Sequence, residues 1–182
     1  LPEKVYAGDN SYYFDRAYEK AEKGDHYGAI SDYTKAIELD PKDASAYHNR
    51  GVAKEILKDY KGALKDYEKA LSIDPYDYST WQGIGVTKKN LGDYYGAISA
   101  YNKSIEINPS NEDAYNNRGN AKKKLGDYYG AISDYTKAIE INPNYAMAYN
   151  NRGSTKEVIG DMQGACDDWR KASYLGYESA AK

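Results

Sequence analysis

The chain contains one cysteine, Cys166, and one phenylalanine, Phe14, among 182 residues. A single cysteine excludes a disulfide within the chain, and with no histidine near it Cys166 is predicted to be a small packing residue rather than a reactive thiol. The only histidines, His26 and His48, form no cluster with metal-ligand spacing. We therefore expect no metal and no other cofactor.

Other absences exclude whole classes of function. No apolar run approaches the ~20 residues of a transmembrane helix, so membrane insertion is not expected. The net charge is −3 and the pI is near 5.5, whereas a nucleic-acid binder normally carries a basic face, so nucleic acid is not an expected partner. Glycine-rich phosphate loops and nucleophile–base arrangements are also missing, and we do not expect an enzyme.

Tyrosine, in contrast, is abundant, with 22 copies. A 34-residue repeat accounts for much of this excess, because other residues recur with the same step. The recurring residues are Pro41, Pro75, Pro109 and Pro143; Gly51, Gly85, Gly119 and Gly153; and Ala29, Ala63, Ala97, Ala131 and Ala165.

The repeats run over 10–43, 44–77, 78–111, 112–145 and 146–179. Apolar residues at helical spacing flank a Gly-Asp pair such as Gly126-Asp127, which predicts two antiparallel helices joined by a tight turn. The second helix is expected to end near Asn142, because a residue before proline disfavours the α region. Residues 1–9 are expected to form a flexible lead segment, and 180–182 to begin a truncated capping segment.

Within a repeat, small and large residues have predicted packing roles. Gly119 and Ala131 are expected to let the two helix backbones approach each other. Aromatic residues recur at one position in each helix and are predicted to be core spacers. These are Tyr13, Tyr47, Trp81, Tyr115 and Tyr149 in the first helix, and Tyr33, Tyr67, Tyr101, Tyr135 and Trp169 in the second.

This pattern of aromatic, small residue, alanine and proline at fixed offsets resembles the tetratricopeptide repeat family over residues 10 to about 175. The stretch YNNRGNAKKKLGDYYGAISDYTKAIEINP is similar to tyrosine-rich bacterial members. The resemblance implies an all-α fold, a right-handed α-solenoid of five helix-turn-helix hairpins. It also implies a non-catalytic protein–protein interaction module whose first helices line a concave groove.

Two positions that are apolar or aromatic in the family are basic here. Four repeats carry an arginine with an aspartate sixteen residues later, whereas the third repeat has Ile84 and Ala100. This joint change predicts an ion pair within each of the four hairpins, and an apolar contact in the third. The pairs are Arg16 with Asp32, Arg50 with Asp66, Arg118 with Asp134, and Arg152 with Asp168. The second basic position holds Lys20, Lys54, Lys88, Lys122 and Lys156.

Carried over position by position, the resemblance places a set of side chains on the groove wall. Asparagine offers a donor and an acceptor that match an extended peptide backbone, and lysine favours an acidic segment. The set comprises Phe14, Asp15, Tyr18, His48, Asn49, Val52, Gln82, Gly83, Val86, Asn116, Asn117, Asn120, Lys123, Asn150, Asn151 and Ser154.

The sequence therefore predicts a module that binds a peptide or protein segment, acidic or extended, in this groove. One alternative is a self-assembling scaffold whose solenoid ends or faces form homo-oligomers. An enzyme would require a catalytic domain beyond these residues. A cytoplasmic location is favoured, with export as the open alternative.

Overall fold

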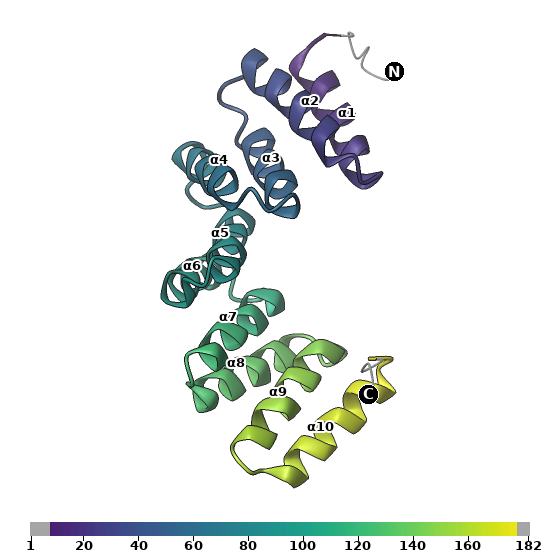
Figure 1. Ribbon diagram of the computed structural model, residues 1–182, viewed down its shortest axis with the longest axis vertical. Helices are drawn as coiled ribbons and strands as arrows, with labels where there is room; N and C mark the ends of the chain where they lie inside the picture. The colour runs from purple at the N-terminus through teal and green to yellow at the C-terminus, as the bar shows by residue number, and fades with distance from the viewer. Residues whose placement is uncertain (1–7, 178–182) are drawn as a thin grey trace. The chain divides into compact units, whose positions relative to one another are not determined.

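The computed structural model describes residues 8–177, which contain ten α-helices and no β-strand (Figure 1). The all-α fold predicted from the sequence is confirmed. Residues 1–7, most of the predicted lead segment, and residues 180–182, the predicted start of a cap, lie outside the described part. The helices are α1 (Asn10–Glu22), α2 (His26–Leu39), α3 (Ala44–Ile56), α4 (Tyr60–Ile73), α5 (Tyr78–Asn90), α6 (Tyr94–Ile107), α7 (Glu112–Lys124), α8 (Tyr128–Ile141), α9 (Ala146–Val158) and α10 (Met162–Tyr174).

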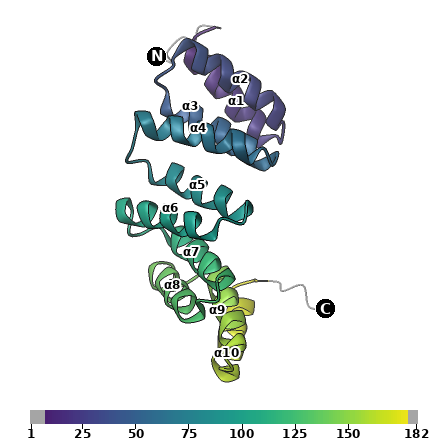
Figure 2. The same ribbon diagram turned by 60° about the vertical axis from the view of Figure 1, so that its left-hand side comes forward.

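The chain divides into two compact units, residues 1–91 with α1–α5 and residues 92–182 with α6–α10. In the first unit, α1 packs on α2 and α3 on α4; in the second, α7 packs on α8 and α9 on α10 (Figure 2). Neighbouring hairpins meet through the second helix of one and the first helix of the next. The predicted third repeat, 78–111, is divided, with α5 in the first unit and α6 in the second.

The second helix of each repeat begins at an aspartate N-cap. Asp59 Oδ1 accepts a hydrogen bond from the Gly62 amide at 3.0 Å, and a Cβ on Gly62 would lie 2.1 Å from Asp59 Oδ2. The carboxylate folds closely over the first turn, and glycine at the third helical position leaves room for it in this conformation. The same pair recurs as Asp25 and Gly28, Asp93 and Gly96, Asp127 and Gly130, and Asp161 and Gly164.

One aromatic residue recurs in the second helix of every repeat, as a buried tyrosine in four repeats and as the half-buried Trp169 in the fifth. The tyrosines at this position, for example Tyr67 and Tyr135, are fully buried. A Cβ on Gly119 would lie 2.7 Å from the Tyr135 ring. The glycine thus makes room for a side chain of the second helix, and at the equivalent Gly153 an added Cβ would also lie 3.1 Å from the backbone oxygen of Ala165, in agreement with the expected close approach. The aromatic residues of the first helices, such as Tyr115, are only half-buried.

The turn between α3 and α4 differs from its counterparts. Lys58 has φ 63°, whereas Gly24, Gly92, Gly126 and Gly160 take the same place with φ between 81° and 86°. A side chain in the left-handed region costs roughly 1 kcal/mol relative to glycine, because Cβ crowds the backbone. The second hairpin therefore carries strain in its turn that the other hairpins avoid.

Replacing Lys58 by glycine should relieve this strain. We expect Lys58→Gly to raise the free energy of unfolding by about 0.5–1 kcal/mol, with part of the gain offset by the greater entropy of the unfolded chain. The reciprocal control is Gly126→Lys, where open space surrounds the added Cβ and a loss of about 1 kcal/mol is expected. Urea unfolding of both variants measures the two changes. A loss of stability in Lys58→Gly would contradict this account of the turn.

Candidate functional site

Each of the four predicted arginine–aspartate sets is a bidentate contact between the two helices of one hairpin. Arg50 Nε donates to Asp66 Oδ2 at 2.8 Å, and Arg50 Nη2 donates to Asp66 Oδ1 at 2.7 Å. The aspartates are at most 4% exposed. The same two bonds, at 2.6–2.9 Å, join Arg16 to Asp32, Arg118 to Asp134 and Arg152 to Asp168.

A lysine completes each of these contacts, a role that the sequence reasoning did not assign. Lys54 Nζ lies 2.7 Å from Asp66 Oδ2, one helical turn beyond Arg50 on the same face of α3. Lys20, Lys122 and Lys156 contact their own aspartates at 2.8–2.9 Å. We call each Arg–Asp–Lys set an ion triad. Because two cations surround one buried carboxylate, each triad carries a net positive charge.

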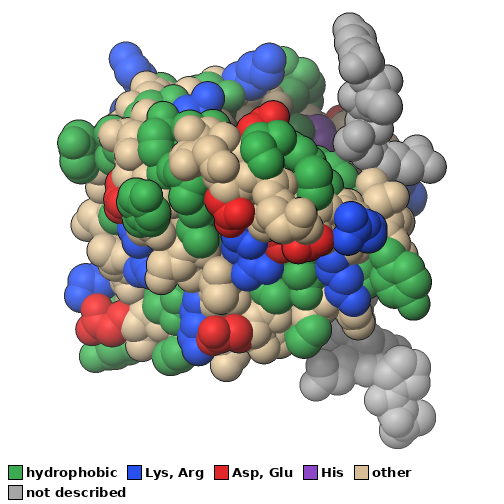
Figure 3. Space-filling view, turned by 90° about the horizontal axis from the view of Figure 1, so that it is seen from below, with side chains coloured by type: hydrophobic (Ala, Val, Ile, Leu, Met, Phe, Trp, Pro, Cys, Tyr) green, Lys and Arg blue, Asp and Glu red, His purple; other side chains and the backbone are tan. Residues whose placement is uncertain are grey.

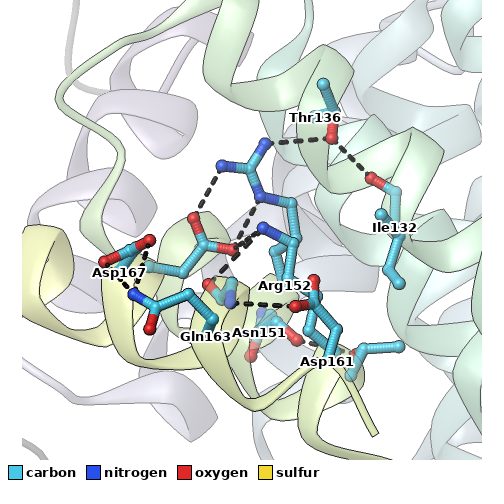
Figure 4. Close-up of polar contacts among 11 residues, drawn as sticks. Ile132, Thr136, Asn151, Arg152, Asp161, Gln163 and Asp167 are labelled. Atoms are coloured by element: carbon cyan, nitrogen blue, oxygen red, sulfur yellow. Dashed lines mark hydrogen bonds and ion pairs between the residues drawn. The ribbon is translucent and has the colours of Figure 1, made fainter. Parts of the chain in front are cut away.

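The remaining arginine nitrogen reaches the preceding hairpin. Arg152 Nη1 donates to Thr136 Oγ1 of α8 at 3.0 Å, and Figure 4 shows its guanidinium between that threonine and the carboxylate on α10. Arg50 reaches Thr34 at 3.1 Å and Arg118 reaches Asn102 at 2.7 Å in the same way. Arg16, in the first hairpin, donates to Tyr12 of its own helix instead. Three triads therefore connect successive hairpins as well as the helices of one hairpin.

The third repeat has no triad. Ile84 and Ala100 are 6% and 3% exposed, which agrees with an apolar substitute for the ion pair. The two residues belong to different units, and their predicted contact stays a prediction.

The first helices of the hairpins share one face. Within the units, α1 contacts α3, α3 contacts α5, and α7 contacts α9. Among the described helices of either unit, no such contact joins α2 to α4, α6 to α8 or α8 to α10. Since the first helices lie closer together than the second helices, their shared side is the concave one. We call this side the inner face of each unit.

The inner face of the first unit carries hollows between α3 and α5. One of about 340 Å³ is lined by residues that include His48, Val52, Gln82 and Val86. A second, of about 310 Å³, includes Asn49 and His48. Closer to the start of the chain, Phe14 packs edge-on against Tyr33, with ring centroids 5.5 Å apart; Tyr18 is 52% exposed.

The inner face of the second unit is rich in amides, and several of them bond within the protein. Asn151 Nδ2 donates to Asn116 Oδ1 at 2.9 Å, and Asn116 is only 2% exposed. Asn120 Oδ1 accepts from the Tyr135 hydroxyl at 2.8 Å, and Asn150 donates to Tyr177 at 3.3 Å. Asn116 therefore packs α7 against α9 and is not accessible to a ligand, so the prediction that it lies on the groove wall is corrected.

What stays accessible on this inner face is a smaller set. Asn117 is half-buried, and its side chain makes no hydrogen bond to the described residues. Burial and the neighbouring Lys124 lower the pKa of Lys123, while Glu157 on α9 acts in the opposite direction. Ser154 lies with Asn150, Trp169 and Tyr177 around a hollow of about 870 Å³. The polar groups with unused bonding capacity thus centre on α7.

The structure also bears on the cysteine, on metal binding and on membrane insertion. Cys166 is exposed, so the prediction that it is a packing residue is wrong; it lies on the outward side of α10. Among residues 8–177, no group of three or more His, Cys, Asp or Glu side chains is arranged to hold a metal ion. None of the helices described is both long and apolar enough to cross a membrane.

Comparison with known proteins assigns the repeat. Family models described as tetratricopeptide repeat match residues 44–77 and 112–145 and, separately, 134–167. Another, described as TPR repeat, matches 17–55 and 87–126. The chain belongs to the tetratricopeptide repeat (TPR) family. A search of curated proteins gave no match.

Solved structures agree with the TPR assignment. The MamA protein has 26% identity and a TM-score of 0.79, with 95% of this chain and 97% of that chain covered. YrrB, described as a TPR protein with an unusual peptide-binding site, has 24% identity, a TM-score of 0.72 and coverage of 92% and 87%. Pseudomonas aeruginosa pilF has 18% identity, a TM-score of 0.86 and coverage of 94% and 78%. TPR proteins bind proteins or peptides and are generally non-catalytic scaffolds, so this chain is a protein–protein interaction module.

The triads can be tested with the substitution that the third repeat already carries. Asp66→Ala leaves Arg50 and Lys54 beside each other without a counter-charge. We expect the substitution to lower the free energy of unfolding by about 2–4 kcal/mol. This is somewhat less than for a fully buried ion pair, because water still reaches the two cations. Arg50→Ile with Asp66→Ala should cost at least about 1 kcal/mol less than the two single changes added together.

Urea unfolding of the four proteins in this double-mutant cycle measures the coupling. Arg170, which is exposed and pairs with Asp167 at 3.0 Å, is the control. Arg170→Ala should change stability by no more than about 0.5 kcal/mol. Strict additivity of the two changes at Arg50 and Asp66 would show that the triad contributes no coupling energy.

The first triad also predicts a pH dependence. The pKa of Asp32 is lowered from 3.8 to about 2. The hydrogen bonds from Arg16 are the largest cause; desolvation acts against them, and Lys20 adds to their effect. The unfolded chain therefore takes up this proton more readily than the folded chain. The stabilisation is complete above about pH 4 and is lost as the pH falls toward 2.

Asp32→Asn removes the titrating group, so the stability difference from the unmodified chain should shrink between pH 5 and pH 2. Urea midpoints measured across this range test it. A difference that stays constant down to pH 2 would mean that Asp32 does not titrate in this window.

Proposed function

We propose that this TPR protein binds an extended peptide or protein segment along its inner face. The observation that carries the proposal is the set of polar groups that the inner face of the second unit leaves unused. Asn117 makes no hydrogen bond to the described residues, while its neighbours Asn116 and Asn120 are fixed by bonds from other helices. A rigid wall that presents an amide without a hydrogen-bond partner suits an extended peptide, because each peptide residue offers one backbone donor and one backbone acceptor.

The charge around these amides favours an acidic segment at this point. Lys123 and Lys124 lie at the end of α7, and Lys123 is partly desolvated there. A partner carboxylate would restore to Lys123 the electrostatic stabilisation that burial removes. Elsewhere the surface is mixed; on the face shown in Figure 3, acidic and basic side chains alternate among hydrophobic ones. Local groups, rather than a broad field, would therefore select the partner.

The test compares the two faces of one hairpin. Asn117→Ala with Lys123→Ala removes the unused amide and the cation from α7 without touching the bond between Asn120 and Tyr135. Its matched control on α8 is Ser133→Ala with Lys137→Ala, because both of those residues are exposed. Binding to an array of extended acidic peptides should fall roughly tenfold in the inner-face variant and stay unchanged in the control.

Equal binding by the two variants would contradict the proposal. Light scattering on the same samples addresses the alternative of a self-assembling scaffold. If the chain associates with itself and captures no peptide, the inner face serves assembly rather than an external segment.

A further inference from the structure

The hollow of about 340 Å³ between α3 and α5 has an unusual combination of wall and floor. Val52, Ile56 and Val86 form aliphatic sides, and the ring of Tyr67 from α4 closes part of the floor. Ile56 is 54% exposed, so the apolar surface opens outward. The carboxylate of Glu55 also lines this hollow. His48, Ser79 and Gln82 are further lining residues. A carboxylate set among aliphatic side chains in a hollow is not expected of a merely solvated surface.

Two buried hydroxyls hold that carboxylate in place. Tyr67 donates to Glu55 Oε2 at 3.2 Å and Thr87 of α5 donates to the same oxygen at 2.8 Å. Both donors are fully buried, and burial together with the charge of Glu55 raises the pKa of Tyr67, which keeps its proton at neutral pH. Glu55 Oε1 accepts no hydrogen bond within residues 8–177, and it remains available to a ligand.

Glu55 also lacks a counter-charge. The four aspartates of the triads each contact two cations, whereas Glu55 forms no ion pair with any described residue. The other titratable group on the wall, His48, bonds to Thr80 through Nδ1 at 2.7 Å. Burial lowers the pKa of His48, against the smaller effect of Asp77. The hollow therefore holds one carboxylate without a counter-charge.

The chemistry of the wall and floor selects one kind of occupant. A lysine or arginine side chain has an aliphatic stem for Val52, Ile56 and Val86, and a cationic donor at its tip for Glu55 Oε1. An acidic side chain would meet a like charge. A purely aliphatic side chain would remove water from Oε1 and offer no donor in exchange.

We infer that this hollow receives a lysine or arginine side chain from a segment of a partner protein, with Glu55 as its counter-charge. The inference rests on the proposed function, because it names a residue that the bound segment must carry. It is specific to the second hairpin. The corresponding residues of the other repeats are Ala21, Lys89, Lys123 and Glu157. Glu157 is exposed, and the aromatic residue of its hairpin is the half-buried Trp169, which has no hydroxyl.

The experiment uses the full chain and a set of nine-residue peptides with blocked ends. They share polar flanks and differ at the central residue, which is Lys, Arg, norleucine, Gln or Glu. Fluorescence anisotropy gives the affinities, and methyl NMR of Val52 and Val86 locates the bound peptide. The unmodified chain should bind the Lys and Arg peptides roughly tenfold more tightly than the norleucine peptide.

Glu55→Gln tests the counter-charge directly. Its amide oxygen can still accept from Tyr67 and Thr87, so the fold should persist, and the preference for Lys and Arg over norleucine should fall to about twofold or less. Glu157→Gln is the matched control at the same repeat position and should keep the full preference. Should Glu55→Gln unfold, Val86→Lys supplies an internal cation without changing Glu55 or its two donors, and it too should remove the preference.

The outcomes separate the two proposals. A preference for basic peptides that survives in folded Glu55→Gln, or in Val86→Lys where Glu55→Gln unfolds, overturns the Lys/Arg site and leaves the inner face as a binding surface. Peptide binding with no basic preference does the same. Basic peptides that bind without shifting the methyl signals of Val52 and Val86 also overturn it. If neither these peptides nor the acidic array binds, both proposals are wrong.

Discussion

A buried aspartate is tolerated at the centre of a helical hairpin only when its charge is compensated at close range, and in this chain that requirement organises the packing. Arg50 and Lys54 approach Asp66 from one face of α3, which fixes the rotation of that helix against α4. The spare nitrogen of the arginine then reaches Thr34 and sets the position of the hairpin before it. Hydrophobic contact alone would allow more rotational freedom, because it is not directional. The recurring triads thus give the repeats a common register.

Much of this arrangement could be predicted because the chain contains its own comparison. Arginine and aspartate are absent together from the third repeat, and this joint change indicated a contact before any geometry was known. Lysine gave no such signal, since Lys88 persists in the third repeat, in which Ala100 replaces the aspartate. Joint changes between repeats can indicate a contact only when both residues vary, and the lysine is present in all five repeats.

Burial on the inner face was harder to predict for a related reason. Asn116 and Asn117 are adjacent and chemically identical, yet a rotation of 100° along the helix turns one into the contact with α9 and leaves the other accessible. Cys166 lies beside the buried Ala165 but is exposed. The repeat likewise explains why tyrosines recur, but not which are buried. Tyr129 at the start of α8 is 76% exposed, whereas Tyr135 in the same helix is fully buried. These distinctions depend on packing between helices, which repeat spacing alone does not resolve.

The left-handed lysine in the turn of the second hairpin connects stability to recognition. The strain in this turn should make the second hairpin open more readily by local unfolding than it would with glycine in place of Lys58, and that hairpin supplies Val52, Glu55 and Tyr67 to the hollow. A segment held between α3 and α5 would bind only the closed hairpin, and its binding energy would therefore suppress the opening. Amide hydrogen exchange in α3 and α4 would then report occupancy of the hollow, and it would be slower in the occupied chain than in the unoccupied one.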